Sequence, residues 1–268
     1  MNTLLKKTKF KQEKSPLPPF FKGGIEENIF LSPFEKGGQG GFFLNFKITS
    51  IIIIVLFSTL LIPEAQSQKI KSAVKLARVK YSGGGDWYND PSGDVNLLKY
   101  VAKCTNINVD PVYEFVDLSS DNLFLYPLIF ITGHGNMKFS ETEIKKLRAY
   151  LQNGGFLYID DDYGLDEFVK REMKRVFPEQ NLIELPYNHG LYSAHFKFTS
   201  GVPKVHEHDN KPAKGYGLFH EGRLCVYYTY ESNPSDGWAD AEVHGDTPER
   251  RELSLKFGVN IVVWALTH

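Results

Sequence analysis

The sequence has few cysteines and no excess of charge of either sign, and both absences narrow its class. Its only cysteines, Cys104 and Cys225, are far apart and form no Cys-x-x-Cys arrangement, which excludes zinc-ribbon and thioredoxin-type sites. The 31 basic and 32 acidic residues give a formal charge of -1, so nucleic acid is not an expected partner. Each cysteine lies in an apolar run, so a disulfide and a pair of buried thiols both stay open.

Familiar phosphate and metal motifs are missing as well. The run Gly83-Gly84-Gly85 lacks the Lys-Ser/Thr of a phosphate loop and the spacing of a dinucleotide fingerprint, so nucleotide binding has little support. The segment His206-Glu207-His208-Asp209 does not have the i, i+4 histidine spacing of metalloproteases. We therefore predict a surface loop there, with no third metal ligand nearby.

The first 67 residues differ in character from the rest of the chain. Residues 16–41 contain a Pro-Phe-x-Lys-Gly-Gly pattern twice, without helical or strand periodicity, and residues 1–46 are predicted to be a non-structural extension. Residues 47–67 combine a lysine, an apolar run and Ala65-Gln66-Ser67, which is typical of a signal peptide; a membrane anchor is the alternative. We expect an exported protein, periplasmic or secreted, or one held at the membrane only through this segment.

Residues 68–268 are predicted to form a single α/β domain. Expected strands cover residues 74–81, 112–116, 127–132 and 156–159, and expected helices begin at Asp94, Ser140, Leu165 and Pro248. This alternation predicts a doubly wound, mostly parallel sheet with helices on both faces. A hairpin over 218–230, turning at Glu221-Gly222, and a final helix over 248–266 complete the prediction.

Three loops follow the predicted buried strands, and the carboxyl ends of parallel strands gather at one edge of a sheet, where ligands bind. These loops cover residues 83–87, 133–136 and 160–164. Glycines in them let the backbone come close to a ligand. The predicted ligand-binding residues of the three loops are Gly84, Gly85, Asp86, Trp87, Gly133, Gly135, Asn136 and Tyr163.

The predicted catalytic residues are His134 and one member of the acidic run 160–162, either Asp161 or Asp162. An imidazole beside a carboxylate can act as general acid and base, and carboxylates can also bind a divalent cation of unknown kind. Adjacent residues of a strand cannot all face one side, so another member is expected to cap the following helix. We also expect the loop of His189 to fold over this crevice and an exposed Trp238 to stack on a sugar ring.

Several blocks of sequence carry a family resemblance. They are Tyr81-Ser-Gly-Gly-Gly-Asp-Trp-Tyr88, Thr132-Gly-His-Gly135, Gly154-Gly-Phe-Leu-Tyr-Ile-Asp-Asp-Asp162, Ser235-Asp-Gly-Trp238 and Gly258-Val-Asn-Ile261. In this order, over about residues 74–267, the chain resembles the bacterial domain of unknown function 4159. The resemblance implies a fold similar to that of the class I glutamine amidotransferases and their non-enzymatic relatives, and it implies no particular activity.

The amidotransferases of this fold carry a nucleophilic cysteine on a tight elbow after a central strand, where this chain has Asp161 or Asp162. Glutaminase chemistry therefore has no visible nucleophile. Two hypotheses follow. The favoured one is a module whose aromatic loops bind a small molecule, a glycan or a protein partner of the cell envelope. The alternative is a hydrolase, cation-dependent or not, that uses an Asp-His pair.

Overall fold

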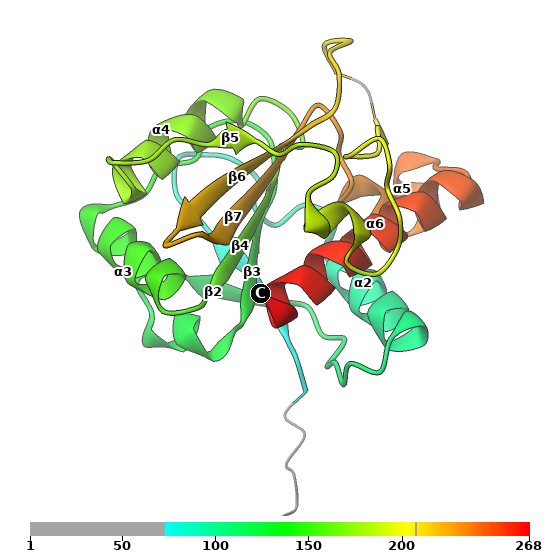
Figure 1. Cartoon of the computed structure of the whole chain (residues 1–268), viewed down its shortest axis with the longest axis horizontal. Helices are drawn as coiled ribbons and strands as arrows, with labels where there is room; N and C mark the ends of the chain where they lie inside the picture. The colour runs from blue at the N-terminus through cyan, green and yellow to red at the C-terminus, as the bar shows by residue number, and fades with distance from the viewer. Residues whose placement is uncertain (1–72, 207) are drawn as a thin grey trace, which may run out of the picture. The chain divides into compact units, whose positions relative to one another are not determined.

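The computed structural model describes residues 73–206 and 208–268; the extension predicted for residues 1–46 and the leader predicted for 47–67 lie outside them. The described residues form one seven-stranded sheet with helices around it (Figure 1). Its strands are β1 (Leu76–Lys80), β2 (Glu114–Asp117), β3 (Leu128–Ile131), β4 (Phe156–Asp160), β5 (Ile183–Glu184), β6 (Lys214–His220) and β7 (Arg223–Tyr230). The helices are α2 (Pro91–Cys104), η1 (Asp121–Leu125), α3 (Glu141–Gln152), α4 (Asp166–Val176), η2 (Gly190–Ser193), η3 (Asp236–Trp238), α5 (Ala241–His244) and α6 (Pro248–Thr267).

The strand order across the sheet is β2-β1-β3-β4-β7-β6-β5. The pairs from β2 through β7 are parallel, whereas β6 runs antiparallel to both β7 and β5. This arrangement confirms the predicted α/β fold with a mostly parallel sheet, a late hairpin and a long final helix. It also places the carboxyl ends of β1, β3, β4 and β7 along one edge, which is where the site forms.

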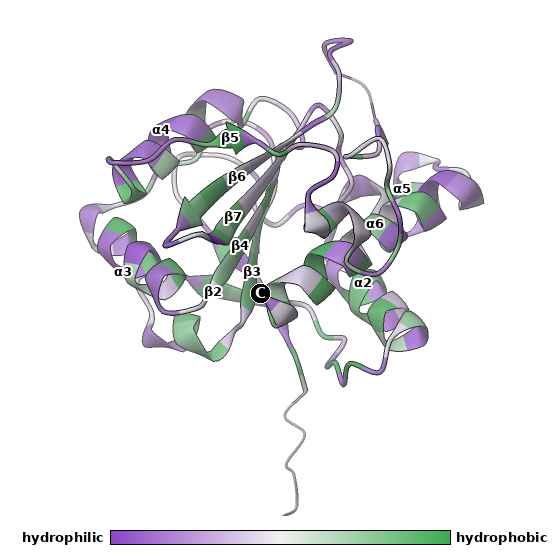
Figure 2. Cartoon of the chain, in the orientation of Figure 1, coloured by the Kyte–Doolittle hydropathy of each residue, from purple (hydrophilic) through white to green (hydrophobic). Residues whose placement is uncertain are grey.

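Helices cover both faces of the sheet, as predicted, and each face has its own apolar core. Alternate strand residues such as Ile129 and Leu157 pack with α3 and α4 in one core. Their neighbours, such as Phe130 and Tyr158, pack with α2 and α6 in the other. Figure 2 shows the central strands mostly in the hydrophobic colour and the outer helix faces mostly in the hydrophilic one. A strand buried on both sides is expected to be apolar along its length, which is the pattern of β3 and of residues 156–159 in β4.

Local signals in the sequence fix several of these elements. Ser140 and Glu143 form the predicted capping box at the start of α3, and each side chain accepts a bond from the other residue's backbone N–H. Helix α6 begins at Pro248 after the N-cap Thr247. The hairpin turns at Glu221 and Gly222, both with positive φ, as a two-residue turn between antiparallel strands requires.

The start of α2 differs from the prediction. The helix begins at Pro91 with Asp90 as its N-cap, whereas Asp94, the predicted N-cap, lies inside the helix and is fully buried. The cause is Arg78 of β1, a charged residue that is 1 % exposed. Its guanidinium neutralises Asp94 through an ion pair of 2.5 Å, so an acidic residue fits inside the helix.

The two cysteines are unpaired, which settles one alternative left open by the sequence. Cys225 is buried within β7, and burial raises the pKa of its thiol to about 11. Cys104 is half-buried at the end of α2. Within residues 73–206 and 208–268, no helix combines the length and the apolar character that crossing a bilayer requires.

Candidate functional site

The three predicted loops meet at the carboxyl edge of the sheet. The Gly85 N–H donates to the Asn136 carbonyl at 3.0 Å, which joins the loop after β1 to the loop after β3. His134 and Tyr163 form a parallel bridge, and the Gly135 N–H donates to the Tyr163 carbonyl at 3.3 Å. Residues that are about 80 positions apart in the chain are therefore neighbours here.

Two glycines allow this close approach. A Cβ on Gly85 would lie 2.6 Å from the His134 carbonyl oxygen, and a Cβ on Gly133 would lie 2.9 Å from Asp86 Oδ1. Gly133 also has a φ of +132°, a region that other residues rarely adopt. Their small size thus brings the loops close to one another, whereas the sequence analysis expected it to bring the backbone close to a ligand.

The centre of the site is His134, held between two carboxylates. Its Nδ1 lies 3.1 Å from Asp86 Oδ2 and 3.2 Å from Asp162 Oδ2. The backbone N–H of His134 also donates to Asp86 Oδ1 at 2.5 Å. Asp162 is 4 % exposed while the imidazole is 53 % exposed, so a buried carboxylate supports a ring that solutes can reach.

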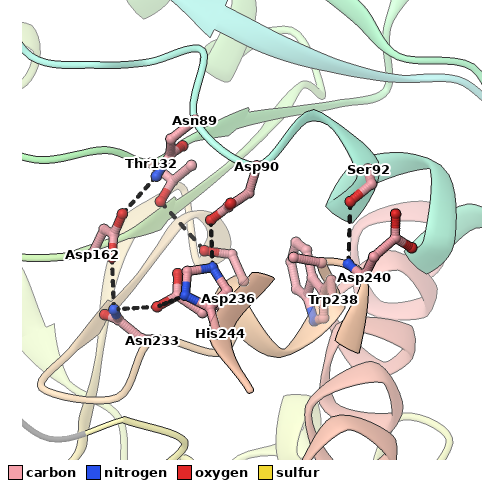
Figure 3. Close-up of polar contacts among 12 residues, drawn as sticks. Asn89, Asp90, Ser92, Thr132, Asp162, Asn233, Asp236, Trp238, Asp240 and His244 are labelled. Carbon is pink, nitrogen blue, oxygen red and sulfur yellow. Dashed lines mark hydrogen bonds and ion pairs between the residues drawn. The ribbon is translucent and has the colours of Figure 1, made fainter. Parts of the chain in front are cut away.

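Asp162 belongs to a row of hydrogen-bonded side chains (Figure 3). Asn89 Nδ2 donates to its Oδ2 at 2.5 Å, and Asn233 Nδ2 donates to its Oδ1 at 2.7 Å. The same Asn233 amide donates to Asp236 Oδ2 at 3.0 Å. Two buried carboxylates, Asp162 and Asp236, are therefore bridged by a single amide group.

The charges at this edge shift each other's pKa values. Burial raises the pKa of Asp162 to about 7, and the neighbouring Asp236 carboxylate adds to the rise. Burial also lowers the pKa of His134, but the carboxylates of Asp162 and Asp86 outweigh this effect and raise it above its usual value. The carboxylates beside His134 therefore favour the protonated form of its ring, as expected for a group that takes up a proton in acid–base chemistry.

The other two members of the acidic run have structural partners. Asp161, named above as a catalytic candidate, accepts from the Leu165 N–H at 2.8 Å and so supports the first turn of α4. Asp160 is fully buried and accepts from the Thr229 hydroxyl and the Ser235 N–H. Of the three, Asp162 is the one that reaches His134.

A second cluster lies beyond β7, and the sequence analysis missed it. His206 Nδ1 lies 2.8 Å from Asp236 Oδ2, and His206 Nε2 lies 3.0 Å from Asp246 Oδ1. His244 Nε2 lies 2.8 Å from Asp90 Oδ2. The prediction that no other ligand lies near His206 was therefore wrong, because η3, α5 and the turn after α5 bring partners from about 30 to 40 positions later. The polar run 231–236, directly after a buried strand, was the signal for this cluster.

Backbone strain marks the same region. Asp90, Glu231 and Asn233 all have a positive φ, which costs free energy for residues other than glycine. Asn233 and Glu231 flank a buried turn after β7, and Asp90 precedes α2 beside it. Strained residues of this kind gather at functional sites, where the surrounding structure holds them in place.

Two predicted site residues are elsewhere. Trp238 is 1 % exposed and packs against Phe130 and Tyr158, so the prediction of an exposed stacking tryptophan was wrong. His189 caps η2 and packs against Trp264, near the end of α6, whereas the site lies near the start of that helix. A helix of this length spans about 30 Å, so His189 does not fold over the crevice.

The remaining predicted residues lie at the rim of the site. The ring of Trp87 contacts Tyr88 and Phe115, and the Asn136 side chain accepts from Arg171 at 3.2 Å. Gly84 has open space around it. Tyr163 is half exposed and its ring lies 4.9 Å from that of His208.

These features define an α/β domain with an acidic, histidine-bearing candidate site at the carboxyl edge of a mostly parallel sheet. The chain belongs to the DUF4159 family, a domain of unknown function, whose family model matches residues 75–266. The family resemblance inferred from the sequence is thereby confirmed. A comparison with curated proteins finds no match.

Proposed function

We propose that the domain is a hydrolase in which His134 is the general acid and base. The observation that carries this proposal is the position of His134 Nδ1, 3.1 Å from Asp86 and 3.2 Å from Asp162. A proton on Nδ1 shared with these carboxylates leaves the lone pair on Nε2 free to take a proton from water. Water then attacks the substrate, and His134 returns the proton to the leaving group while Asp162 stabilises the charged ring.

The charge around His134 limits the substrate class. Asp86, Asp162 and Asp236 are all close enough to raise its pKa, so a negatively charged substrate would be repelled. A neutral, polar substrate such as a glycan or an amide fits this site best. We also propose that the fold is related to that of the class I glutamine amidotransferases. The amidotransferase nucleophile is missing from this site, since both cysteines lie outside it.

The proposal can be tested with the purified full chain and a panel of neutral chromogenic esters, glycosides and anilides. For the substrate class that is turned over, His134→Gln should lower kcat/KM by about 10²–10⁴-fold, the usual contribution of a general acid–base group. Asp162→Asn should lower it as well. The matched control is His195→Gln, which changes an exposed histidine near α6. Equal rates for the wild-type chain and His134→Gln would refute the proposal.

A second candidate function is glycan binding without turnover. It is favoured by a crevice of about 410 Å³ beside Asp161 that is lined by Tyr163, His208 and Tyr230. Tyr163 is the half-exposed ring of this set, and an exposed aromatic ring can stack on a sugar ring. Tyr163→Ala should then weaken glycan binding in calorimetry, whereas His134→Gln should leave it unchanged.

We further propose that the domain works outside the cytoplasm. The proposal rests on the signal-peptide pattern of residues 47–67. A small molecule, a glycan or a protein partner of the cell envelope would then be the available ligands. Fractionation of cells that express the full chain tests this, and recovery of the protein in the cytoplasm alone would contradict it.

A further inference from the structure

We propose that His206, Asp236 and His244 bind one divalent cation of the zinc type. One ligand atom from each of these side chains lies within 4.8 Å of the other two. Asp236 Oδ2 lies 2.8 Å from His206 Nδ1 and 3.8 Å from His244 Nδ1. Zinc holds nitrogen and oxygen ligands at about 2.0–2.2 Å, which places neighbouring ligands of a tetrahedron roughly 3.3–3.6 Å apart. The two contacts bracket this spacing, so small side-chain rotations bring all three atoms to a common ion.

The hydrogen bonds of the two histidines favour the same assignment. Asp246 Oδ1 lies 3.0 Å from His206 Nε2, and Asp90 Oδ2 lies 2.8 Å from His244 Nε2. Each outer carboxylate therefore favours a proton on Nε2. His206 Nδ1 also faces a carboxylate and donates to Asp236 in this structure, so an ion that binds here takes the place of the Nδ1 proton. Histidines that bind metals are oriented in this way, with the second nitrogen donating to a carboxylate or carbonyl.

A second observation is the presence of buried carboxylate oxygens without a partner. Asp236 Oδ1 and Asp246 Oδ2 accept no hydrogen bond from any group in the described part of the chain. The two residues are only 5 % and 7 % exposed. His206 and Arg250 both reach Asp246 at Oδ1, at 3.0 Å and 3.4 Å, and not at Oδ2. Buried carboxylates are normally satisfied by donors or by a metal ion, and a divalent cation beside Asp236 fulfils that requirement for Asp236.

The donor set decides the kind of cation. Two imidazole nitrogens and one carboxylate suit zinc and similar transition metals, whereas magnesium and calcium prefer oxygen ligands alone. Three protein ligands also leave a coordination position for water or a ligand, as in catalytic zinc sites. Asn233 connects this centre to Asp162, but metal binding does not depend on whether His134 acts in hydrolysis.

The test uses the full chain after treatment with a chelator, titrated with zinc chloride in a calorimeter and compared with magnesium chloride. We expect one zinc ion per chain and no comparable binding of magnesium. Asp90→Asn should weaken zinc binding by about 10–100-fold, as loss of an outer carboxylate does, and His244→Gln should weaken it at least as much. His195→Gln serves as the matched control and should bind zinc like the wild type.

His244 lies in the short, exposed helix α5, so its substitution is expected to leave the fold intact, and circular dichroism checks this. Failure of the wild-type chain to bind zinc would overturn the proposal, as would unchanged affinity in the folded His244→Gln variant. The outcome is distinct from that of the hydrolase test. If the chain binds zinc but turns over no substrate, the metal-site proposal stands and the hydrolase proposal falls. If it turns over a substrate but binds no zinc, the hydrolase proposal stands and the metal-site proposal falls.

Discussion

Arg78 and Asp94 form an ion pair that is closed to solvent, with 2.5 Å between Nη2 and Oδ1 and side-chain exposures of 1 % and 0 %. The second terminal nitrogen of Arg78, Nη1, donates to two oxygens of Asn89. These are the backbone carbonyl and, at 3.0 Å, the side-chain Oδ1. Because Asn89 Nδ2 in turn binds Asp162, this ion pair beneath α2 fixes a residue of the candidate site. Because the pair is closed to solvent, its role is to position Asn89.

Replacing Arg78 by methionine should therefore destabilise the protein strongly. Asp94 would remain buried without its partner, and breaking a buried pair in this way costs about 3–5 kcal/mol. Urea denaturation measures the loss in the free energy of unfolding. The double variant Arg78→Met with Asp94→Leu should lose much less, since no buried charge is left over. Equal losses in the single and double variants would contradict this account.

The pH dependence of stability should change when Asp161 becomes asparagine. Burial raises the pKa of Asp161 from 3.8 to about 6, so the folded chain holds this proton more tightly than the unfolded chain does. The group's contribution to stability is therefore greatest at low pH, falls as pH rises from about 4 to about 6, and stays lost above that.

Asparagine keeps the acceptor for the Leu165 N–H, and its amide can donate to Tyr228, whose hydroxyl already donates to Asp166. The free energy of unfolding of Asp161→Asn minus that of the wild type should thus increase from pH 4 to pH 7. Each unit of raised pKa is equivalent to about 1.4 kcal/mol, which gives an expected increase of roughly 1–3 kcal/mol. Chemical denaturation at both pH values measures it, and an unchanged difference would refute the assignment.

Gly133 should tolerate alanine less well than Gly135 does. Both have a positive φ, but a Cβ on Gly133 would lie 2.5 Å from the Tyr81 hydroxyl, whereas one on Gly135 meets nothing within 4 Å. Gly135→Ala should therefore cost about 1–2 kcal/mol from backbone strain alone. Gly133→Ala should cost more and also displace Asp86 from His134. Thermal denaturation of the two variants compares them, and equal melting temperatures would show that the contact with Tyr81 is unimportant.

Much of the fold was predictable because local signals agreed with the pattern of apolar residues. The continuous apolar runs of β3 and β4 and the capping box at Ser140 each predicted one element, and the alternation of strands and helices predicted the sheet. The meeting of His134 with the acidic run 160–162 followed from the rule that strand ends share an edge, but the choice of Asp162 over Asp161 came from the structure. The start of α2 was mispredicted, because the burial of Arg78 depends on a partner 16 positions later.

The histidine cluster beyond β7 could not be found by inspecting spacing. His206, Asp236 and His244 come from separate segments, and their proximity depends on how the chain turns after β7. The prediction that Trp238 is exposed was wrong for a related reason. The turn residues around it suggested exposure, whereas η3 buries the ring beneath α6. Short turns with buried polar groups are set by tertiary contacts, which local propensity does not report.

The row that joins Asn89, Asp162, Asn233 and Asp236 draws on the beginning, the middle and the end of the described chain. No fragment that stops before β7 contains both carboxylates, and no fragment that begins at α2 or later contains Asn89, which donates to the first of them. The candidate site at this edge is thus complete only when the whole span from Asn89 to Asp236 is present, and a nascent chain that ends before β7 lacks it.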